Sequence, residues 1–185
     1  MRPAVACLLV LVTAGAAAGE IPATAIERQG ARYVVMAEAL LHTPPADVYA
    51  RLTDFEHLNR LHSTVSESAP LPGAAPGWQR VRVLSQACVL FFCYDLLQIL
   101  DYRLETPEDL QAVIVPADTD FRSGRLRWRM APGTDGGTHL RFEAELEPAF
   151  WVPPLIGPWI LKQKLVSMAS GIVENLEQQP KEESR

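Results

Sequence analysis

Four histidines are the side chains whose type and spacing most directly suggest chemistry. They are His42, His57, His62 and His139, and an imidazole titrates close to neutral pH, which suits it to general acid or base catalysis. His57 and His62 are five residues apart, whereas two ligands stacked on one helical face are three or four apart. His139 lies beside a turn on a charged strand, where we expect it to be solvated. The histidines are therefore candidates for moving a proton.

The sequence lacks the motifs of other common catalytic sites. It contains no Gly-x-Ser-x-Gly, no paired catalytic carboxylates and no phosphate-binding loop. Cys88 and Cys93 have no histidine pair at ligand spacing beside them, which argues against zinc. We therefore predict no catalytic residues, no metal and no cofactor, and we favour binding over catalysis. The alternative is an enzyme in which one histidine or acid moves a proton.

The two cysteines leave two local structures open. If residues 89–92 form the tip of a hairpin, Cys88 and Cys93 can form a disulfide across it, whereas on one continuous strand residues five apart face opposite ways. A hairpin would place four apolar residues at an exposed tip, which could make peripheral membrane contact, meet a partner or gate a cavity. The alternative is that the tip folds back into the core. These four residues are Val89, Leu90, Phe91 and Phe92.

The first nineteen residues resemble a secretory signal peptide. Arg2 precedes an apolar run at residues 4–12, and small residues fill positions 14–19, the layout of a cleavable export signal. The run is too short to span a bilayer. We therefore expect residues 1–19 to be removed and the protein to be exported, either periplasmic or secreted, which permits a disulfide.

Composition indicates one globular domain that does not bind nucleic acid. The 185 residues are 48% hydrophobic and 21% charged, enough for one sizeable core. Loss of Arg2 takes the formal net charge from −5 to −6, and nucleic acids or anionic membranes bound by charge need the opposite sign. We expect a single domain at residues 31–179, after a loosely structured lead at residues 21–30, and a polar tail at residues 180–185.

The apolar periodicity predicts strands followed by one long helix. Alternation predicts a strand at residues 33–42, and two short helices follow it, the first capped by Thr43 with Pro45 in its first turn and the second, at residues 56–61, capped by Asp54. A weak strand at residues 63–69 and a meander of further strands come next. Those strands are expected at residues 78–86, 94–105, 110–115, 121–130 and 140–147.

The last segment, residues 150–176, has apolar residues at steps of three and four, which predicts an amphipathic helix with one face to be buried. Gly171 lies on this helix, where glycine costs about 1 kcal/mol relative to alanine, and it indicates close packing or cavity space. The expected fold is α+β, with a curved antiparallel sheet of about six to seven strands wrapped around the helix.

Charges on the last two strands predict their register. Arg125, Arg127 and Arg129 share one face of their strand, and glutamates alternate along the next strand. We expect Arg129 opposite Glu143, with Trp128 facing Ala144, because the nearby alternative pairs Arg129 with Arg141, and like charges in that position destabilise a sheet. The arginines are then a solvated face neutralised by glutamates, and an anion-binding patch is the alternative.

The segment at residues 43–55, Thr-Pro-Pro-Ala-Asp-Val-Tyr-Ala-Arg-Leu-Thr-Asp-Phe, resembles the START-like (SRPBCC) superfamily, which includes polyketide cyclases and coenzyme-Q-binding proteins. Pro45, the pair Val48 and Tyr49, and the pair Asp54 and Phe55 match its opening pattern. The resemblance implies the helix-grip fold, with a cavity for a lipid, quinone, sterol or polyketide between sheet and helix. Where members commonly have a proline and an aromatic residue, this chain has Asn-Arg-Leu at residues 59–61, so the resemblance does not fix that end of the pocket.

A pocket of this kind would draw its lining from the inner faces of the strands and the helices. The alternative for each residue is that it fills the core, but a large aromatic and aliphatic surface is what an apolar ligand needs. A small hydrophobic ligand is thus the expected partner, and the alternatives are a cyclase or aromatase using the same cavity, or an interaction protein whose cavity is filled. The candidate ligand-binding residues are Phe55, Tyr94, Trp128, Phe142, Trp151, Trp159, Leu165 and Met168.

Overall fold

A computed structural model describes residues 19–89, 92–117, 119–150 and 157–178. In chain order, its strands and helices are β1 (Glu20–Gln29), β2 (Arg32–Leu41), α1 (Pro45–Leu52), the 3-10 turn η1 (Leu58–Arg60), β3 (Val65–Leu71), β4 (Trp78–Val89), β5 (Phe92–Thr106), β6 (Asp109–Ile114), β7 (Phe121–Pro132), the 3-10 turn η2 (Thr134–Gly136), β8 (Thr138–Pro148) and α2 (Gly157–Glu177).

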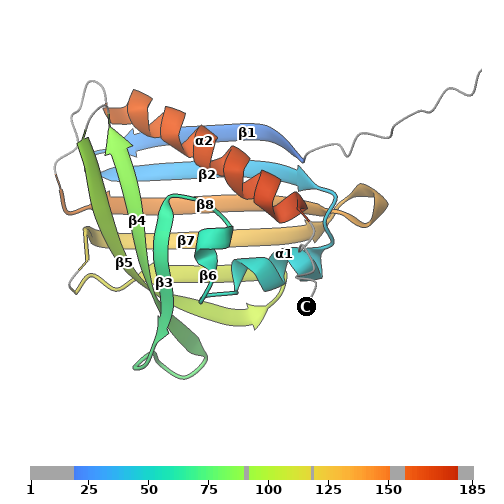
Figure 1. Ribbon diagram of the computed structural model, residues 1–185, viewed down its shortest axis with the longest axis horizontal. Helices are drawn as coiled ribbons and strands as arrows, with labels where there is room; N and C mark the ends of the chain where they lie inside the picture. Colours follow the sequence, from blue (N-terminus) through green and yellow to red (C-terminus); the bar gives the residue numbers. More distant parts are fainter. Residues whose placement is uncertain (1–18, 90–91, 118, 151–156, 179–185) are drawn as a thin grey trace, which may run out of the picture.

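The eight strands form one antiparallel sheet in the order β1-β2-β8-β7-β6-β5-β4-β3. Figure 1 shows the sheet curving around α2, which lies across its concave side, with α1 beside the C-terminal end of α2. The predicted α+β helix-grip architecture is confirmed. No helix in the described part of the chain is long and apolar enough to cross a membrane.

The first strand was not predicted. We expected residues 21–30 to be loose, but Glu20–Gln29 forms the edge strand β1, which pairs with β2 from Gln29 opposite Arg32 to Glu20 opposite Leu40. Gly30 adopts a φ of 66° in the turn that joins them, a conformation open to glycine. The prediction was wrong because backbone pairing and contact with α2 order a segment that lacks a clear period of its own.

The short helices follow the prediction in place but not in capping. Pro45 opens α1, and Val48, Leu52 and the following Phe55 are buried. Thr43 does not cap α1: its hydroxyl donates to the carbonyl oxygen of Leu176 at 2.7 Å, and so satisfies the end of α2 instead. The second helix is only the turn η1.

Asp54 does not cap that turn either. No side chain caps η1, and Asp54 Oδ1 lies 2.8 Å from His57 Nδ1. The Asp54 carboxylate therefore pairs with the His57 imidazole, three residues along the chain, and not with a backbone N–H.

The C-terminal end of α2 is tied to α1. Arg51 Nη1 donates to the carbonyl oxygens of Leu176 and Gln178, each at 2.7 Å, and the backbone N–H of His42 donates to Glu177 at 2.6 Å. A helix leaves its last carbonyls without internal partners, and the Arg51 bonds supply two such partners, whereas the His42 bond is to the carboxylate side chain of Glu177. They fix the helix over the sheet, with Val173 and Leu176 in the core. The helix begins at Gly157, and residues 151–156 lie outside the described residues.

The predicted register of β7 and β8 was wrong. Arg129 pairs with Arg141, and Trp128 pairs with Phe142 in place of Ala144. The negative charge of Glu143 offsets the repulsion between the two arginines. Glu143 accepts from Arg141 Nε at 2.9 Å and lies 3.4 Å from Arg129 Nη1. On the inner face the same register brings the rings of Trp128 and Phe142 to 5.2 Å. Shared acceptors and aromatic packing therefore outweigh the pairwise charge argument.

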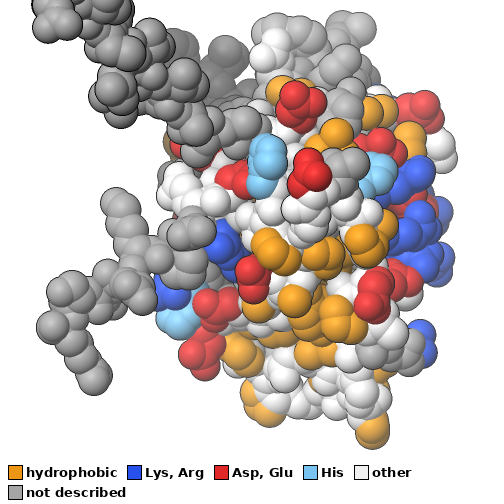
Figure 2. All heavy atoms as spheres, turned by 90° about the vertical axis from the view of Figure 1, so that its right-hand side faces the viewer, with side chains coloured by type: hydrophobic (Ala, Val, Ile, Leu, Met, Phe, Trp, Pro, Cys, Tyr) orange, Lys and Arg blue, Asp and Glu red, His pale blue; other side chains and the backbone are white. Residues whose placement is uncertain are grey.

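The outer face of the sheet is a network of opposite charges. Figure 2 shows blue side chains along its right-hand edge with red ones among them. Arg127 donates to Asp109 through Nε at 2.7 Å, and this bond holds the pKa of the Asp109 carboxyl below its usual value. Arg122 lies 3.9 Å from Glu147. This arrangement agrees with a solvated, neutralised face.

The cysteines lie on a hairpin and not on one continuous strand. Cys88 and Cys93 are opposite each other in the β4–β5 ladder, and Cys93 is disulfide-bonded. Residues 90 and 91 at the tip are outside the described residues, so the predicted exposure of this tip stays a prediction.

Candidate ligand-binding site

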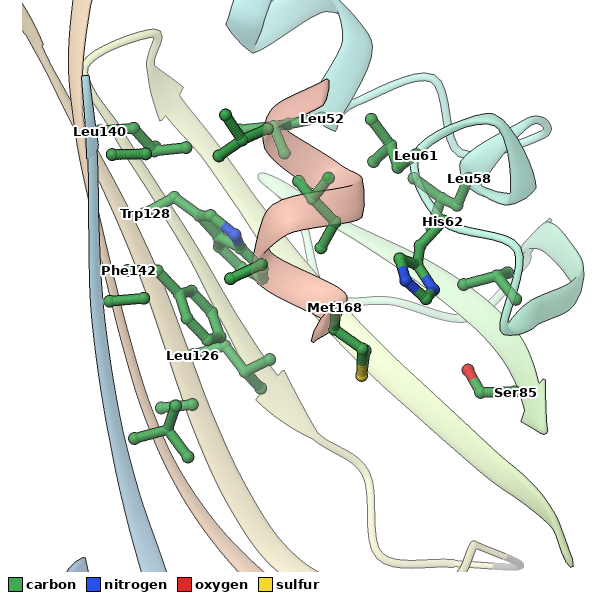
Figure 3. Close-up of a pocket in the computed structure, with 18 of the residues that line it drawn as sticks. Leu52, Leu58, Leu61, His62, Ser85, Leu126, Trp128, Leu140, Phe142 and Met168 are labelled. Atoms are coloured by element: carbon green, nitrogen blue, oxygen red, sulfur yellow. The ribbon is translucent and has the colours of Figure 1, made fainter. Parts of the chain in front are cut away.

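A cavity of about 290 Å³ lies between the inner face of the sheet, α2 and the segment after η1. Its volume is close to the lower end of the range typical of small-molecule pockets. The lining comes from every strand except β6, and also from α1, η1, the segment after η1 and α2 (Figure 3). The described lining residues are Ile21, Thr24, Val35, Ala37, Glu38, Ala39, Leu52, Leu58, Leu61, His62, Val65, Val83, Ser85, Gln98, Leu100, Tyr102, Leu126, Trp128, Leu140, Phe142, Ala144, Leu146, Met168, Ala169, Ile172 and Val173.

Aromatic rings form one wall of the cavity. Trp128 on β7 lies 6.0 Å from Tyr102 and 5.2 Å from Phe142, between ring centroids. In Figure 3 Trp128, Phe142 and Leu126 lie on one side, across the cavity from His62 and Ser85. The inward residues of antiparallel strands alternate with outward ones, so one continuous hydrophobic face results.

Three of the predicted ligand-binding residues line this cavity and two do not. Trp128, Phe142 and Met168 are in the lining. Phe55 is buried behind Tyr102, with ring centroids 4.6 Å apart, and serves the core. Tyr94 is 58% exposed and is not part of the lining. By alternation it shares the face of Gln98, Leu100 and Tyr102, but it is opposite Ala87, next to the pair Cys88 and Cys93 at the hairpin end of β5, beyond the lining residues of these two strands.

The other three predicted residues cannot be placed in the site. Trp151 lies outside the described residues. Trp159 and Leu165 belong to α2, but their side chains are also outside the description. Their role in binding stays a prediction.

Six polar residues in the lining were not predicted as ligand-binding residues: Thr24, Glu38, His62, Ser85, Gln98 and Tyr102. A signal for two of them was present in the strand pattern, since Ser85 continues the inward row of Val81 and Val83, and Gln98 precedes the buried Leu100. A polar residue at an inward position is either paired or functional. Among the described residues, Thr24 Oγ1 is buried without a hydrogen-bond partner.

His62 is held in one orientation by Thr64. Its Nδ1 accepts the backbone N–H of Thr64 at 3.1 Å and lies 2.8 Å from the Thr64 hydroxyl. Burial lowers the pKa of His62 below its ordinary value, which favours the neutral ring. Because Nδ1 is an acceptor, the proton of the neutral ring is on Nε2. The cavity is thus lined by an imidazole N–H donor.

Gly171 allows this imidazole to approach α2. A Cβ at residue 171 would lie 2.8 Å from His62 Cδ2 and 3.0 Å from Nε2, closer than carbon atoms in contact normally lie. Asn175 Nδ2 also donates to the carbonyl oxygen of Leu61 at 2.9 Å, which joins the same two segments. The glycine predicted to mark close packing or cavity space therefore accommodates a side chain of the cavity.

Tyr102 contributes a buried phenol. It is 6% exposed, and burial raises its pKa above the ordinary value, so it is a neutral hydroxyl at neutral pH. Among the described residues, no three metal-ligating side chains gather at a site that could hold an ion.

The fold and the site together define a helix-grip protein with an apolar internal cavity. Residues 34–178 match the family model described as "Polyketide cyclase / dehydrase and lipid transport". Because the match covers most of the chain, the protein belongs to this family, within the START-like superfamily. No curated protein sequence matches the chain.

Solved structures with the same fold are distant in sequence. A START superfamily protein from Mycobacterium smegmatis aligns with a TM-score of 0.65 at 14% identity, covering 78% of this chain and 97% of that one. The Zhui aromatase/cyclase from Streptomyces sp. R1128 aligns with a TM-score of 0.62 at 12% identity, covering 78% and 91%. A STAR-related lipid transfer protein from Xanthomonas axonopodis gives 0.58 at 16%, covering 83% and 96%. At these identities the likeness concerns the fold alone.

Proposed function

We propose that this protein binds one small hydrophobic molecule in the cavity and carries or shields it without covalent chemistry. The observation that carries the proposal is the 290 Å³ cavity, whose lining is mostly aliphatic and aromatic. Removing a ligand's apolar surface from water contributes roughly 25 cal/mol per Å². The family, which includes lipid transport in its description, supports the same kind of ligand.

Ala37 offers a direct test of whether the cavity is the binding site. It lines the cavity on β2, opposite Phe142 in the ladder, so Ala37→Leu fills space that a ligand would take. We expect an apolar fluorescent probe to bind the wild-type protein with one-to-one stoichiometry and to bind Ala37→Leu at least tenfold more weakly. Met36→Leu is the matched control, because Met36 is the exposed neighbour on the outer face. Equal binding by wild type and Ala37→Leu would show that the probe sits elsewhere.

A cyclase-type enzyme is the second candidate, and the position of His62 favours it. An imidazole N–H beside an apolar cavity could polarise a carbonyl while the walls hold a reactive chain folded. The probe is a short triketone, whose ring closure is followed by absorbance. An acceleration that His62→Phe abolishes would support catalysis, and a rate equal to that in buffer would leave binding as the function.

Export is part of the proposal. The pattern of residues 1–19 supports an exported protein, and an oxidising compartment suits the disulfide of Cys93. Cell fractionation with N-terminal sequencing tests this: we expect a mature chain that begins at Gly19 or Glu20 in the exported fraction. An intact N-terminus in the cytoplasmic fraction would contradict it.

A further inference from the structure

Three polar side chains gather on one side of the cavity: His62, Ser85 and Gln98. The backbone N–H of Gln86 donates to the carbonyl oxygen of Thr64 at 2.7 Å, which joins the His62 segment to β4 beside Ser85. Gln98 is opposite Val83, so it is the diagonal neighbour of Ser85 on the same face of the sheet. Figure 3 shows His62 and Ser85 across the cavity from Leu126, Trp128 and Phe142.

The groups that this polar side presents to the cavity are not used by the protein. Within the described part of the chain, the side chains of Ser85 and Gln98 make no hydrogen bond, and His62 is bonded through Nδ1 alone. His62, Ser85 and Gln98 are half-buried, and a ligand that fills the cavity would separate them from water. Polar groups without access to water are costly unless they are paired. An occupant with an oxygen at this place would pair with them, whereas a hydrocarbon would leave them unpaired.

The charge of the lining indicates a neutral occupant. No Lys or Arg is among the described lining residues, and the one carboxylate among them belongs to Glu38. Its side chain lies on the outer face of the sheet, 3.8 Å from Arg141 Nη1 and 3.8 Å from His139 Nε2. A ligand carboxylate would therefore enter the cavity without a described cation, and an unpaired buried charge is strongly unfavourable.

We infer that the ligand is a neutral hydrophobic molecule with a carbonyl or hydroxyl oxygen, which accepts a hydrogen bond from His62 Nε2 and lies within reach of Ser85 and Gln98. Its apolar body packs against Trp128 and Phe142. This inference rests on the proposed function and adds the class of ligand. His62 is a binding residue in this account, and Gly171 keeps its ring at the helix.

Three probes that share a naphthalene skeleton separate the possibilities. They are 2-acetylnaphthalene, which has a neutral oxygen, 2-isopropylnaphthalene, which has none, and 2-naphthoate, which is charged. Protein freed of co-purified molecules is titrated with each by calorimetry. We expect the ketone to bind about tenfold more tightly than the hydrocarbon, the effect of one well-placed hydrogen bond in a site of low polarity, and the naphthoate to bind most weakly.

Variants assign the effect to the polar side of the cavity. His62→Phe should weaken the ketone about tenfold and change hydrocarbon binding by less than twofold. His57→Phe is the matched control, because His57 is outside the lining and pairs with Asp54 on the surface. If His62→Phe does not fold, Ser85→Ala provides the test, with an expected loss of several-fold for the ketone alone.

The outcomes distinguish this inference from the proposed function. Equal affinity for ketone and hydrocarbon would overturn the polar contact while leaving the hydrophobic carrier in place. Tightest binding of naphthoate would overturn the neutral class. Ketone affinity unaffected by His62→Phe or Ser85→Ala would overturn the assignment to these residues. Failure of all three probes to bind would overturn the proposed function and this inference with it.

Discussion

Gly171→Ala sets two effects of similar size against each other. Alanine is favoured over glycine in the interior of a helix by about 1 kcal/mol, so the substitution stabilises α2 taken alone. The new methyl group would lie 2.8 Å from His62 Cδ2, so the ring must move. That ring is fixed by Thr64, whose backbone N–H it accepts at 3.1 Å.

When His62 is present, the clash should outweigh the gain in helix propensity, so that Gly171→Ala destabilises the protein. Overpacking of this kind costs about 1–3 kcal/mol, and loss of the Thr64 bond costs about 1 kcal/mol more if the ring is displaced. We therefore expect Gly171→Ala to lower the free energy of unfolding by about 1 kcal/mol. In a His62→Ala background the contact is absent, and the same substitution should raise the free energy of unfolding by about 1 kcal/mol.

Urea unfolding of the four proteins in this double-mutant cycle measures the coupling, which we expect to be about 2 kcal/mol. Ser170→Ala is the control for helix propensity, because Ser170 is exposed on the same turn and bonds only to Val166. It should stabilise the protein by about 0.5 kcal/mol in both backgrounds. A Gly171→Ala protein that gains the same stability with and without His62 would refute the contact.

Other predictions concern the helix clamp, the imidazole and the cavity volume. Thr43→Val removes the buried bond to the carbonyl oxygen of Leu176 and should lower the free energy of unfolding by about 1–3 kcal/mol, measured in urea; an unchanged value would contradict the clamp. Burial lowers the pKa of His62 below 6.5, so the unfolded state takes up a proton first as pH falls. Stability from this group is therefore present above pH 6.5 and lost below it. Thermal unfolding between pH 7.5 and 5.5 should show a smaller loss in His62→Gln than in wild type, and equal losses would contradict the burial. Ala37→Leu should raise thermal stability when no ligand is bound, since the cavity is partly filled, whereas Met36→Leu should not change it.

Periodicity was sufficient to predict the main elements. The alternation in β2, β7 and β8 and the three-and-four spacing in α2 are local signals, and burial of one face is their direct consequence. The sheet, the long helix and the cavity-lining positions of Trp128, Phe142 and Met168 are within reach of such reasoning.

Features that depend on partners distant in the chain were not predictable in this way. β1 is ordered by pairing with β2, and Thr43 caps a helix 133 residues away rather than its own. The register of β7 and β8 depends on a glutamate shared by two arginines, which a comparison of residue pairs does not include. His62 was noted only as a titratable group, because its place beside Gly171 arises from the packing of the segment after η1 against α2.

The central claim is that the cavity holds a small hydrophobic molecule, and native mass spectrometry of the protein purified from the cells that produce it tests it most directly. The account predicts a mass increment of one neutral molecule per chain in the wild type, recovered by solvent extraction, and its loss in Ala37→Leu but not in Met36→Leu. A protein that carries no molecule and binds no apolar probe would contradict the account.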